Sequence, residues 1–426
     1  MKDWTRPTNP RPVWLALYVV VNAICGLIIY NGNRLLGETQ DLRLDDRAMV
    51  LPATLIVILS YIGLLAVAFP TLSRMKVAPR AAATPRQEKA AGIVLFLLQL
   101  GFIAFFESTG TFVAGSTERS DSIFSAIWAF LSVDSLFFIY YGFHRESRLF
   151  WPNLAIALVS NLLRGWTGIF LLVAFMESAR AMRRRRFSLK LFVPIVLGVV
   201  IAFPVVNLLK LQIRAMSAGP DANVSFLELA SNTAGELTPA DYLTLIGSSG
   251  EALLARMHLV SNTLAVQAKH GELSGAIRSG TIEPYWREGI YGIAWDRITG
   301  RSGGAYNLGV ELAYAIDSDQ EEGSWNSNPG YAGWLILDPE SAPLYLGYTL
   351  GLMALSVWLI KRMGAGAAGH DMLWFACLGF MVPGWIASFV LFFNALVMVF
   401  LFNLVTAHRS SAGATRLRPP ARVAEG

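Results

Sequence analysis

Long apolar stretches, each near the length of a membrane span, alternate along this chain with shorter polar segments. A helix that crosses the hydrocarbon core of a bilayer needs about 20 mostly apolar residues. The pattern therefore predicts an all-α polytopic membrane protein with about ten transmembrane helices. We expect spans at 13–30, 49–72, 91–106, 123–141, 149–163, 166–176, 189–209, 335–360, 372–385 and 386–405.

One long polar segment interrupts this series before the last three spans. The chain is thus predicted to contain seven helices within 1–209, a loop at 210–334, three helices within 335–408 and a disordered tail at 409–426. The loop is expected to be partly helical, because it carries helix-start signals. A Thr-Pro-Ala-Asp motif predicts a short helix to about Ile246. A capping-box pattern predicts an amphipathic helix from Glu251 to Lys269.

Basic residues gather in the segments that connect alternate spans. Cytoplasmic loops of membrane proteins carry such an excess of Lys and Arg, so both termini are predicted to be cytoplasmic and the long loop to lie outside. The strongest marker is the basic run from Arg180 to Arg186. We interpret this run as a cytoplasmic anchor beside anionic lipid.

Composition supports the membrane class and argues against several others. The 426 residues are 54% hydrophobic and only 15% charged, whereas a soluble protein usually has about 25% charged residues. Most of the basic residues lie at the ends of the predicted spans, so the net charge of +5 does not indicate a nucleic acid partner. Cys25 and Cys377 lie in apolar runs, which predicts no disulfide. The loop residues His258 and His270 lack nearby ligands at metal-binding spacing, so neither a metal nor a cofactor is expected.

The first candidate catalytic residues are arginines predicted to lie near the outer surface of the membrane. Arg164 joins two short predicted spans, which places it near the outer interface or within the bundle. An intramembrane arginine that faces the protein is a functional candidate. Arg256 and His258 follow on the predicted amphipathic helix.

A second cluster mixes aromatic rings, arginines and carboxylates in the loop. Arg278, Trp286, Arg287 and Arg297 belong to it, and Asn326 precedes the eighth span. Rings stack on sugar faces, carboxylates accept hydrogen bonds from hydroxyl groups, and arginine holds phosphate bidentately. For the aromatics as a group, the favoured alternative is that they form the loop's own core or an interfacial belt.

Three local patterns give the chain a family resemblance. They are an Arg164-Gly165 turn, an Arg-(apolar)-Ser pattern from Arg256 to Ser261, and a polar Pro/Gly entry from Asn326 to Gly333. With the ten-span layout, these patterns resemble the Wzy-type oligosaccharide repeat-unit polymerases and the related O-antigen ligases. The resemblance implies a metal-independent glycosyltransferase of the bacterial inner membrane with a periplasmic loop. Its substrates would be an undecaprenyl-pyrophosphate-linked glycan donor and acceptor, and its partners membrane lipid and a chain-length regulator.

Residue roles follow from this resemblance and from the reaction it implies. Arg164, Arg256 and His258 are predicted to be catalytic. Substrate binding is predicted for five loop residues, Arg278, Trp286, Arg287, Arg297 and Asn326. A base that deprotonates the acceptor hydroxyl is expected among His258, Glu251, Asp296 and Glu283.

Three other functions compete with this interpretation. An O-antigen ligase has the same layout and differs in its acceptor. Another C-type lipid-linked glycosyltransferase would use acids in the first outer loop, where Asp45 and Asp46 lie. A transporter or flippase is less favoured, because the chain shows no internal repeat and few charges within its spans.

Overall fold

A computed structural model describes residues 8–40, 42–44, 46–79, 83–112, 122–185, 250, 254, 257–300, 307–317 and 326–416, without the side chains of 293, 297 and 407–416. Within these ranges the chain is helical throughout and forms no strand beyond one isolated bridge between Arg34 and Arg43. The predicted all-α class is therefore confirmed.

Six helices in the described ranges are long and apolar enough to cross a bilayer. They are α1 (Pro10–Gly32), the continuous run Arg47–Ser73 that contains α2 (Val50–Tyr61) and α3 (Phe69–Ser73), α4 (Pro85–Thr109), α5 (Ile123–Leu131) with α6 (Val133–His144), α17 (Ala342–Arg362) and α19 (Ile386–Arg416). Three shorter helices, α7 (Phe150–Leu163), α8 (Gly168–Arg183) and α18 (Ala367–Ala376), complete the bundle. The transmembrane character is thus supported, while the count of about ten spans stays a prediction.

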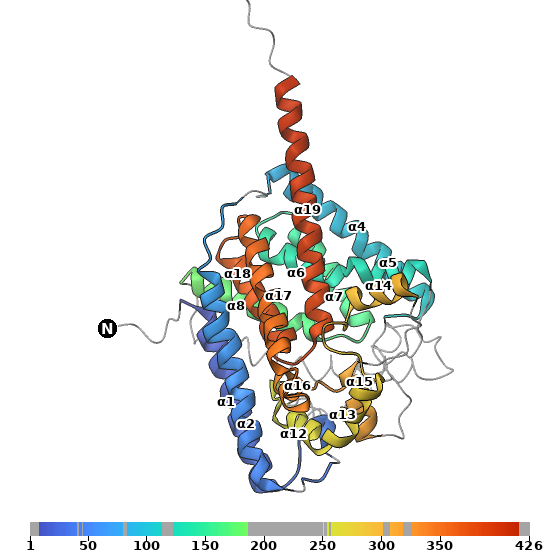
Figure 1. Ribbon diagram of the computed structural model, residues 1–426. Coiled ribbons are helices and arrows are strands. Elements are labelled where there is room, and N and C mark those ends of the chain that lie inside the picture. The colour runs from blue at the N-terminus through green and yellow to red at the C-terminus, as the bar shows by residue number, and fades with distance from the viewer. Residues whose placement is uncertain are drawn as a thin grey trace, which may run out of the picture.

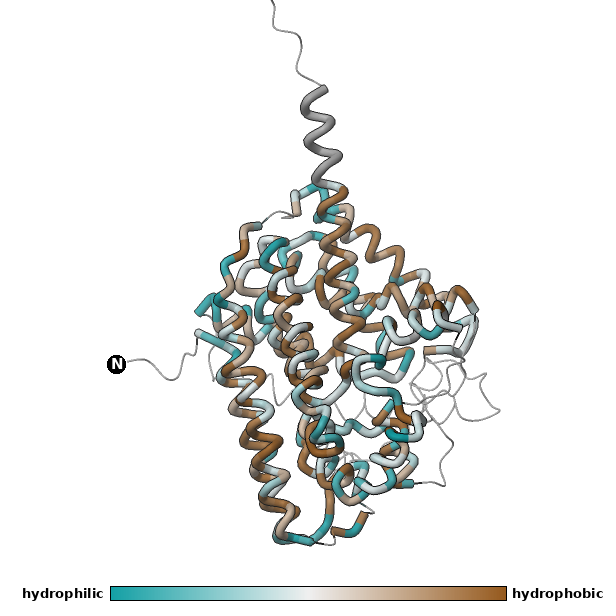
Figure 2. The backbone as a smooth tube through the Cα atoms, viewed as in Figure 1, coloured by the Kyte–Doolittle hydropathy of each residue, from teal (hydrophilic) through white to brown (hydrophobic). Residues whose placement is uncertain are grey.

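The outward faces of these helices are apolar, as a surface in contact with lipid should be. On α1, Leu17, Val20, Ile24 and Leu27 are exposed, and Figure 2 shows apolar residues along the outside of the α1–α2 hairpin. The same helix buries Asn22 and Tyr18 on its inner face. The bundle therefore turns its polar side chains inward, where protein groups can satisfy them.

Two predicted spans are interrupted in the structure. The span expected at 335–360 is two helices, α16 (Gly330–Leu337) and α17, separated at Asp338–Ser341. The carboxylate of Asp338 accepts a hydrogen bond from the Ser341 backbone N–H (3.3 Å), which stabilises a turn before the proline at the start of α17. The span at 123–141 bends at Ser132, whose φ of 44° ends α5.

The turn between α18 and α19 occurs at the predicted Pro383-Gly384 break. Gly384 has a φ of +82°, and a Cβ placed on it would lie 3.0 Å from the backbone of Gly330. The Gly330 N–H donates to the carbonyl of Pro383 (3.0 Å), so the two backbones touch directly. This contact joins the end of the loop to the helical bundle. α19 itself continues to Arg416, beyond the predicted last span.

The loop contributes α12 (Val260–Ala268), α13 (His270–Ser279), α14 (Ile290–Thr299) and α15 (Leu308–Ile316). In Figure 1, α12, α13, α15 and α16 gather at the end of the bundle opposite the free end of α19. The helix predicted over 251–269 is interrupted at His258 and Leu259, which are not helical. Its second half is helical, as α12, but this helix is buried on nearly all sides and is not amphipathic.

Asn22 of α1 explains this break. Its side chain donates to the carbonyl of Met257 (3.1 Å) and accepts from the N–H of Leu259 (2.8 Å). Tyr61 of α2 also donates to the Met257 carbonyl (3.4 Å). These side chains replace backbone partners that a continuous helix would have used. The loop is thereby anchored between α1 and α2.

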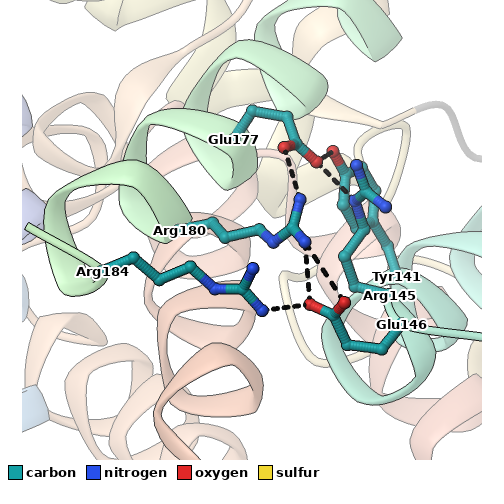
Figure 3. Close-up of polar contacts among 6 residues, drawn as sticks. All are labelled: Tyr141, Arg145, Glu146, Glu177, Arg180 and Arg184. Atoms are coloured by element: carbon teal, nitrogen blue, oxygen red, sulfur yellow. Dashed lines mark hydrogen bonds and ion pairs between the residues drawn. The ribbon is translucent and has the colours of Figure 1, made fainter. Parts of the chain in front are cut away.

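The basic end of α8 forms ion pairs within the protein. Figure 3 shows Arg180 and Arg184 binding Glu146, at 2.9 Å and 2.6 Å. In the same view, Arg145 binds Glu177 (2.5 Å). The arginines predicted to form a lipid anchor therefore also connect α8 to the segment after α6.

Candidate functional site

A cavity of about 310 Å³ lies where the loop meets the start of α17. Its walls come from the end of α13, the segment 282–287, and the junction between α16 and α17. The aromatic and polar residues in these walls are Glu283, Tyr285, Trp286, Arg287, Trp334, Asp338, Ser341 and Tyr345. The cavity therefore combines stacking surfaces with hydrogen-bonding groups of both kinds.

Backbone turns fix the segment that carries Trp286 and Arg287. Gly280 ends α13 with a φ of +78°, and the Arg287 N–H donates to the carbonyl of Pro284 (2.9 Å). Gly289 has a φ of +98°, and a Cβ there would lie 3.1 Å from the Cα of Ala387. Only glycine allows both this conformation and this approach. The segment is consequently held against the first turn of α19.

The aromatic wall is built around Tyr285. Its ring packs edge-on against Tyr345 at 4.7 Å and against Trp334 at 5.9 Å between centroids. These three rings are buried, whereas the loop aromatics Trp286, Tyr291 and Trp295 are exposed. Trp286 differs, because 48% of its surface stays exposed while its ring contacts Tyr285 at 4.8 Å. It offers a free ring face at the cavity.

Only some of the charged side chains in the cavity walls have an ion-pair partner among the described residues. Arg287 forms an ion pair with Asp296. Glu283 and Asp338 also line the cavity, and no salt bridge involves either within the described residues. Burial raises the pKa of Glu283 above its ordinary value, and the nearby Arg287 opposes that rise. The lining is therefore rich in acceptors.

Three donor atoms beside this cavity are buried without a hydrogen-bond partner among the described residues. They are Trp334 Nε1, Tyr345 Oη and Arg287 Nε. The first two belong to side chains that are 4% and 1% exposed. A buried donor without a partner costs free energy, so such atoms often mark places where a ligand or water binds.

Two other predicted loop residues, Arg278 and Asn326, do not line the cavity. Arg278 is exposed in the last turn of α13. Asn326 is also exposed and donates to Asn307 Oδ1 (3.3 Å) at the start of α15. Arg297 is on α14 with its side chain outside the description, and Arg256 falls outside the described residues. Their predicted roles stay predictions.

Arg164 occupies an enclosed position in the α7–α8 hairpin. Its side chain is 1% exposed and forms a salt bridge with Asp134 of α6 (2.7 Å). The guanidinium carbon lies 4.6 Å from the ring centre of Trp166 and 5.0 Å from that of Phe102. The cation is thus bound by a carboxylate and by aromatic faces from within the protein.

His258 is buried at the break before α12. It is 1% exposed, and neither ring nitrogen has a partner among the described residues. Burial lowers its pKa to about 4, so the imidazole is neutral at neutral pH. It does not line the cavity, unlike Trp286 and Arg287.

Five of the eight aromatic and polar residues in the cavity walls were not predicted as site residues, namely Tyr285, Trp334, Asp338, Ser341 and Tyr345. Asp338 and Tyr345 were assigned to the interior of the span at 335–360, and Trp334 to its polar approach. The available signal was the motif Asp338-Pro339-Glu340, which places two carboxylates and a proline inside an apolar run. That motif predicts a helix break near the membrane surface.

Comparisons with protein-family models, curated proteins and solved structures found no match to this chain. In the described part of the chain, no group of three or more His, Cys, Asp or Glu residues is arranged to hold a metal ion. The function of the chain is therefore inferred from its helical architecture and from the residues that line the cavity.

Proposed function

We propose that this chain is an integral membrane glycosyltransferase that polymerises undecaprenyl-pyrophosphate-linked oligosaccharide units. The observation that carries the proposal is the aromatic and carboxylate-lined cavity between a polar loop and an apolar helical bundle. A substrate with a lipid tail and a sugar head needs both environments next to each other. The reaction is assigned to the periplasmic face of the bacterial inner membrane, with both termini cytoplasmic.

The cavity binds the acceptor sugar in this scheme, with Glu283 as the general base. The acceptor hydroxyl oxygen forms a bond to the anomeric carbon of the donor glycan. The bond from that carbon to the pyrophosphate oxygen breaks, and the electron pair leaves with undecaprenyl pyrophosphate. The hydroxyl proton passes to the Glu283 carboxylate, which later releases it to water.

Glu283 suits this role better than the other predicted bases within the description. It lines the cavity, and burial raises its pKa, which makes the ionised carboxylate a stronger base. Asp296 is held by Arg287. His258 is enclosed elsewhere. Glu251 lies outside the described residues.

Loop arginines outside the cavity are proposed to stabilise the leaving pyrophosphate. Arg278 is exposed and has no salt bridge among the described residues, so its guanidinium is available to phosphate. Arg256 and Arg297 keep their predicted roles in the same group. Fixed cations at the leaving group stabilise the charge that develops there in the transition state. Arg164 is assigned a positioning role, because Asp134 and aromatic rings already bind it.

Gene deletion followed by analysis of the surface glycan tests this function. The deletion strain should carry only single repeat units in place of a ladder, and the wild-type gene should restore the ladder. Complementation with Glu283→Gln should restore little polymer, whereas Glu272→Gln on the exposed face of α13 should restore it fully. Long lipid-linked chains in the deletion strain would instead indicate a ligase. A normal glycan ladder would refute the proposal.

A further inference from the structure

We infer that the cavity binds a pyranose without an anionic group and excludes both sugar acids and pyrophosphate. The inference rests on the proposed function for the role of that sugar as acceptor. The binding preference itself follows from the charges and the rings that line the cavity.

The charges select against anions. Arg287 is the cation among the described lining residues, and Asp296 already neutralises it. Glu283 and Asp338 add two carboxylates to the same walls. A uronic acid or a pyrophosphate would bring further negative charge next to them without a free cation to offset it. Like charges placed this close in a partly buried site repel each other.

The carboxylates favour hydroxyl groups. Glu283 and Asp338 line the cavity without a salt bridge among the described residues, so both can accept hydrogen bonds from a ligand. The hydroxyl groups of a pyranose can donate to them, whereas an ionised carboxylate offers no donor.

The rings and the volume favour a pyranose over a smaller polyol. Trp286 presents an exposed ring at the cavity, and this ring contacts the ring of Tyr285 edge-on. The flat face of a pyranose carries C–H groups that pack well on such a ring. A cavity of about 310 Å³ is at the small end of ligand sites, which suits one sugar unit of a longer glycan.

Binding to the full-length protein in lipid nanodiscs tests the preference, with saturation-transfer NMR as the readout. The probes are the methyl glycosides of a neutral hexose and a hexuronic acid, with inorganic pyrophosphate as competitor. The neutral glycoside should bind at least about tenfold more tightly than the hexuronate, and pyrophosphate should not displace it. Equal binding of the hexuronate, displacement by pyrophosphate, or no binding of the neutral glycoside would each overturn the inference.

Variants locate the binding within the cavity. Trp286→Ala removes the exposed ring of the cavity wall and should abolish neutral glycoside binding. Trp295→Ala removes an exposed tryptophan on α14 that does not line the cavity, and it should change nothing. Unchanged binding in Trp286→Ala would overturn the assignment to this cavity.

The two proposals fail in different assays. Loss of the glycan ladder on gene deletion, combined with no glycoside binding, would overturn the inference and leave the proposed function standing. A normal ladder in the deletion strain, combined with selective binding of the neutral glycoside, would overturn the proposed function while the cavity keeps its sugar preference.

Discussion

The guanidinium of Arg164 is bound by Asp134 and enclosed by Phe102 and Trp166. Arg164→Ala would leave the carboxylate without its partner and a gap between the rings. We expect a loss of about 3 kcal/mol in stability, near the low end for a buried pair because Asp134 is partly exposed. The measurement is the thermal midpoint of the purified protein in detergent.

Arg278→Ala provides the matched control, because Arg278 is exposed and should leave the midpoint unchanged. Asp134→Asn should destabilise the protein in the same direction as Arg164→Ala. If Arg164→Ala kept the wild-type midpoint while the glycan ladder disappeared, Arg164 would act directly on the substrate.

Glu288 predicts a pH dependence of stability. Burial raises its pKa to about 8, well above the ordinary value of a carboxyl group. The folded protein therefore holds a proton that the unfolded chain releases near pH 4. This contribution to stability is complete below about pH 4 and is lost as the pH rises through 8, by on the order of 4 kcal/mol. Thermal midpoints measured from pH 5 to 9 should fall more in the wild type than in Glu288→Gln. Equal slopes would contradict the assignment.

A local signal in the sequence pointed to part of the cavity lining, while the binding roles themselves stay predictions. Trp286 and Arg287 were identified by their aromatic and basic neighbours, and both line the cavity. Asp338 and Tyr345 were not, because their place in the cavity depends on a break within an apolar run and on packing against the loop. The partnership of Arg164 with Asp134 joins different helices, and no spacing rule connects them.

At the scale of elements, Asn22 holds the loop to the α1–α2 hairpin. Its side-chain amide hydrogen-bonds the Met257 carbonyl and the Leu259 N–H, which lie at the break in the helix before α12. Asn22→Leu would leave the Leu259 N–H unpaired, at about 1–3 kcal/mol, and the Met257 carbonyl with the hydrogen bond from Tyr61. We expect faster amide hydrogen exchange across 257–268 and little change in α17.

Thr54→Val is the control for this experiment, because the Thr54 hydroxyl bonds only the Val50 carbonyl of its own helix. Its exchange pattern should match that of the wild type. Unchanged exchange at 257–268 in Asn22→Leu would show that the loop is anchored by other contacts.

Apolar length predicted where helices lie better than where they end. The runs at 13–30 and 91–106 correspond to α1 and α4, since neither contains a charged residue or a proline. The runs at 123–141 and 335–360 are each divided, by a left-handed Ser132 and by the turn at Asp338–Ser341. A single polar residue such as Ser132 inside an apolar run is too weak a signal to locate a break, whereas the motif Asp338-Pro339-Glu340 is a stronger one.

At the scale of the whole molecule, one carboxylate connects three helices that are distant in sequence. Asp371 of α18 is 1% exposed and binds Arg11 of α1 (2.9 Å) and Arg183 of α8. Asp371→Asn would leave two cations without their common partner. We expect a loss of about 3 kcal/mol in stability, measured as the thermal midpoint.

Glu146→Gln is the contrasting variant, because Glu146 is 66% exposed and its ion pairs with Arg180 and Arg184 face solvent. Exposed pairs contribute about 0–1 kcal/mol, so this midpoint should change little. Equal effects of Asp371→Asn and Glu146→Gln would mean that the buried carboxylate does not hold the three helices together.

The most direct test of the proposed function is glycosyl transfer by the purified protein in proteoliposomes supplied with lipid-linked repeat units. The wild type should form dimers and longer products, at a rate that rises with pH as Glu283 ionises. Glu283→Gln should slow transfer by about 10²–10⁴-fold while neutral glycoside binding persists. Transfer at the wild-type rate by Glu283→Gln would contradict its role as the base, and absence of product from the wild type would contradict the proposed function itself.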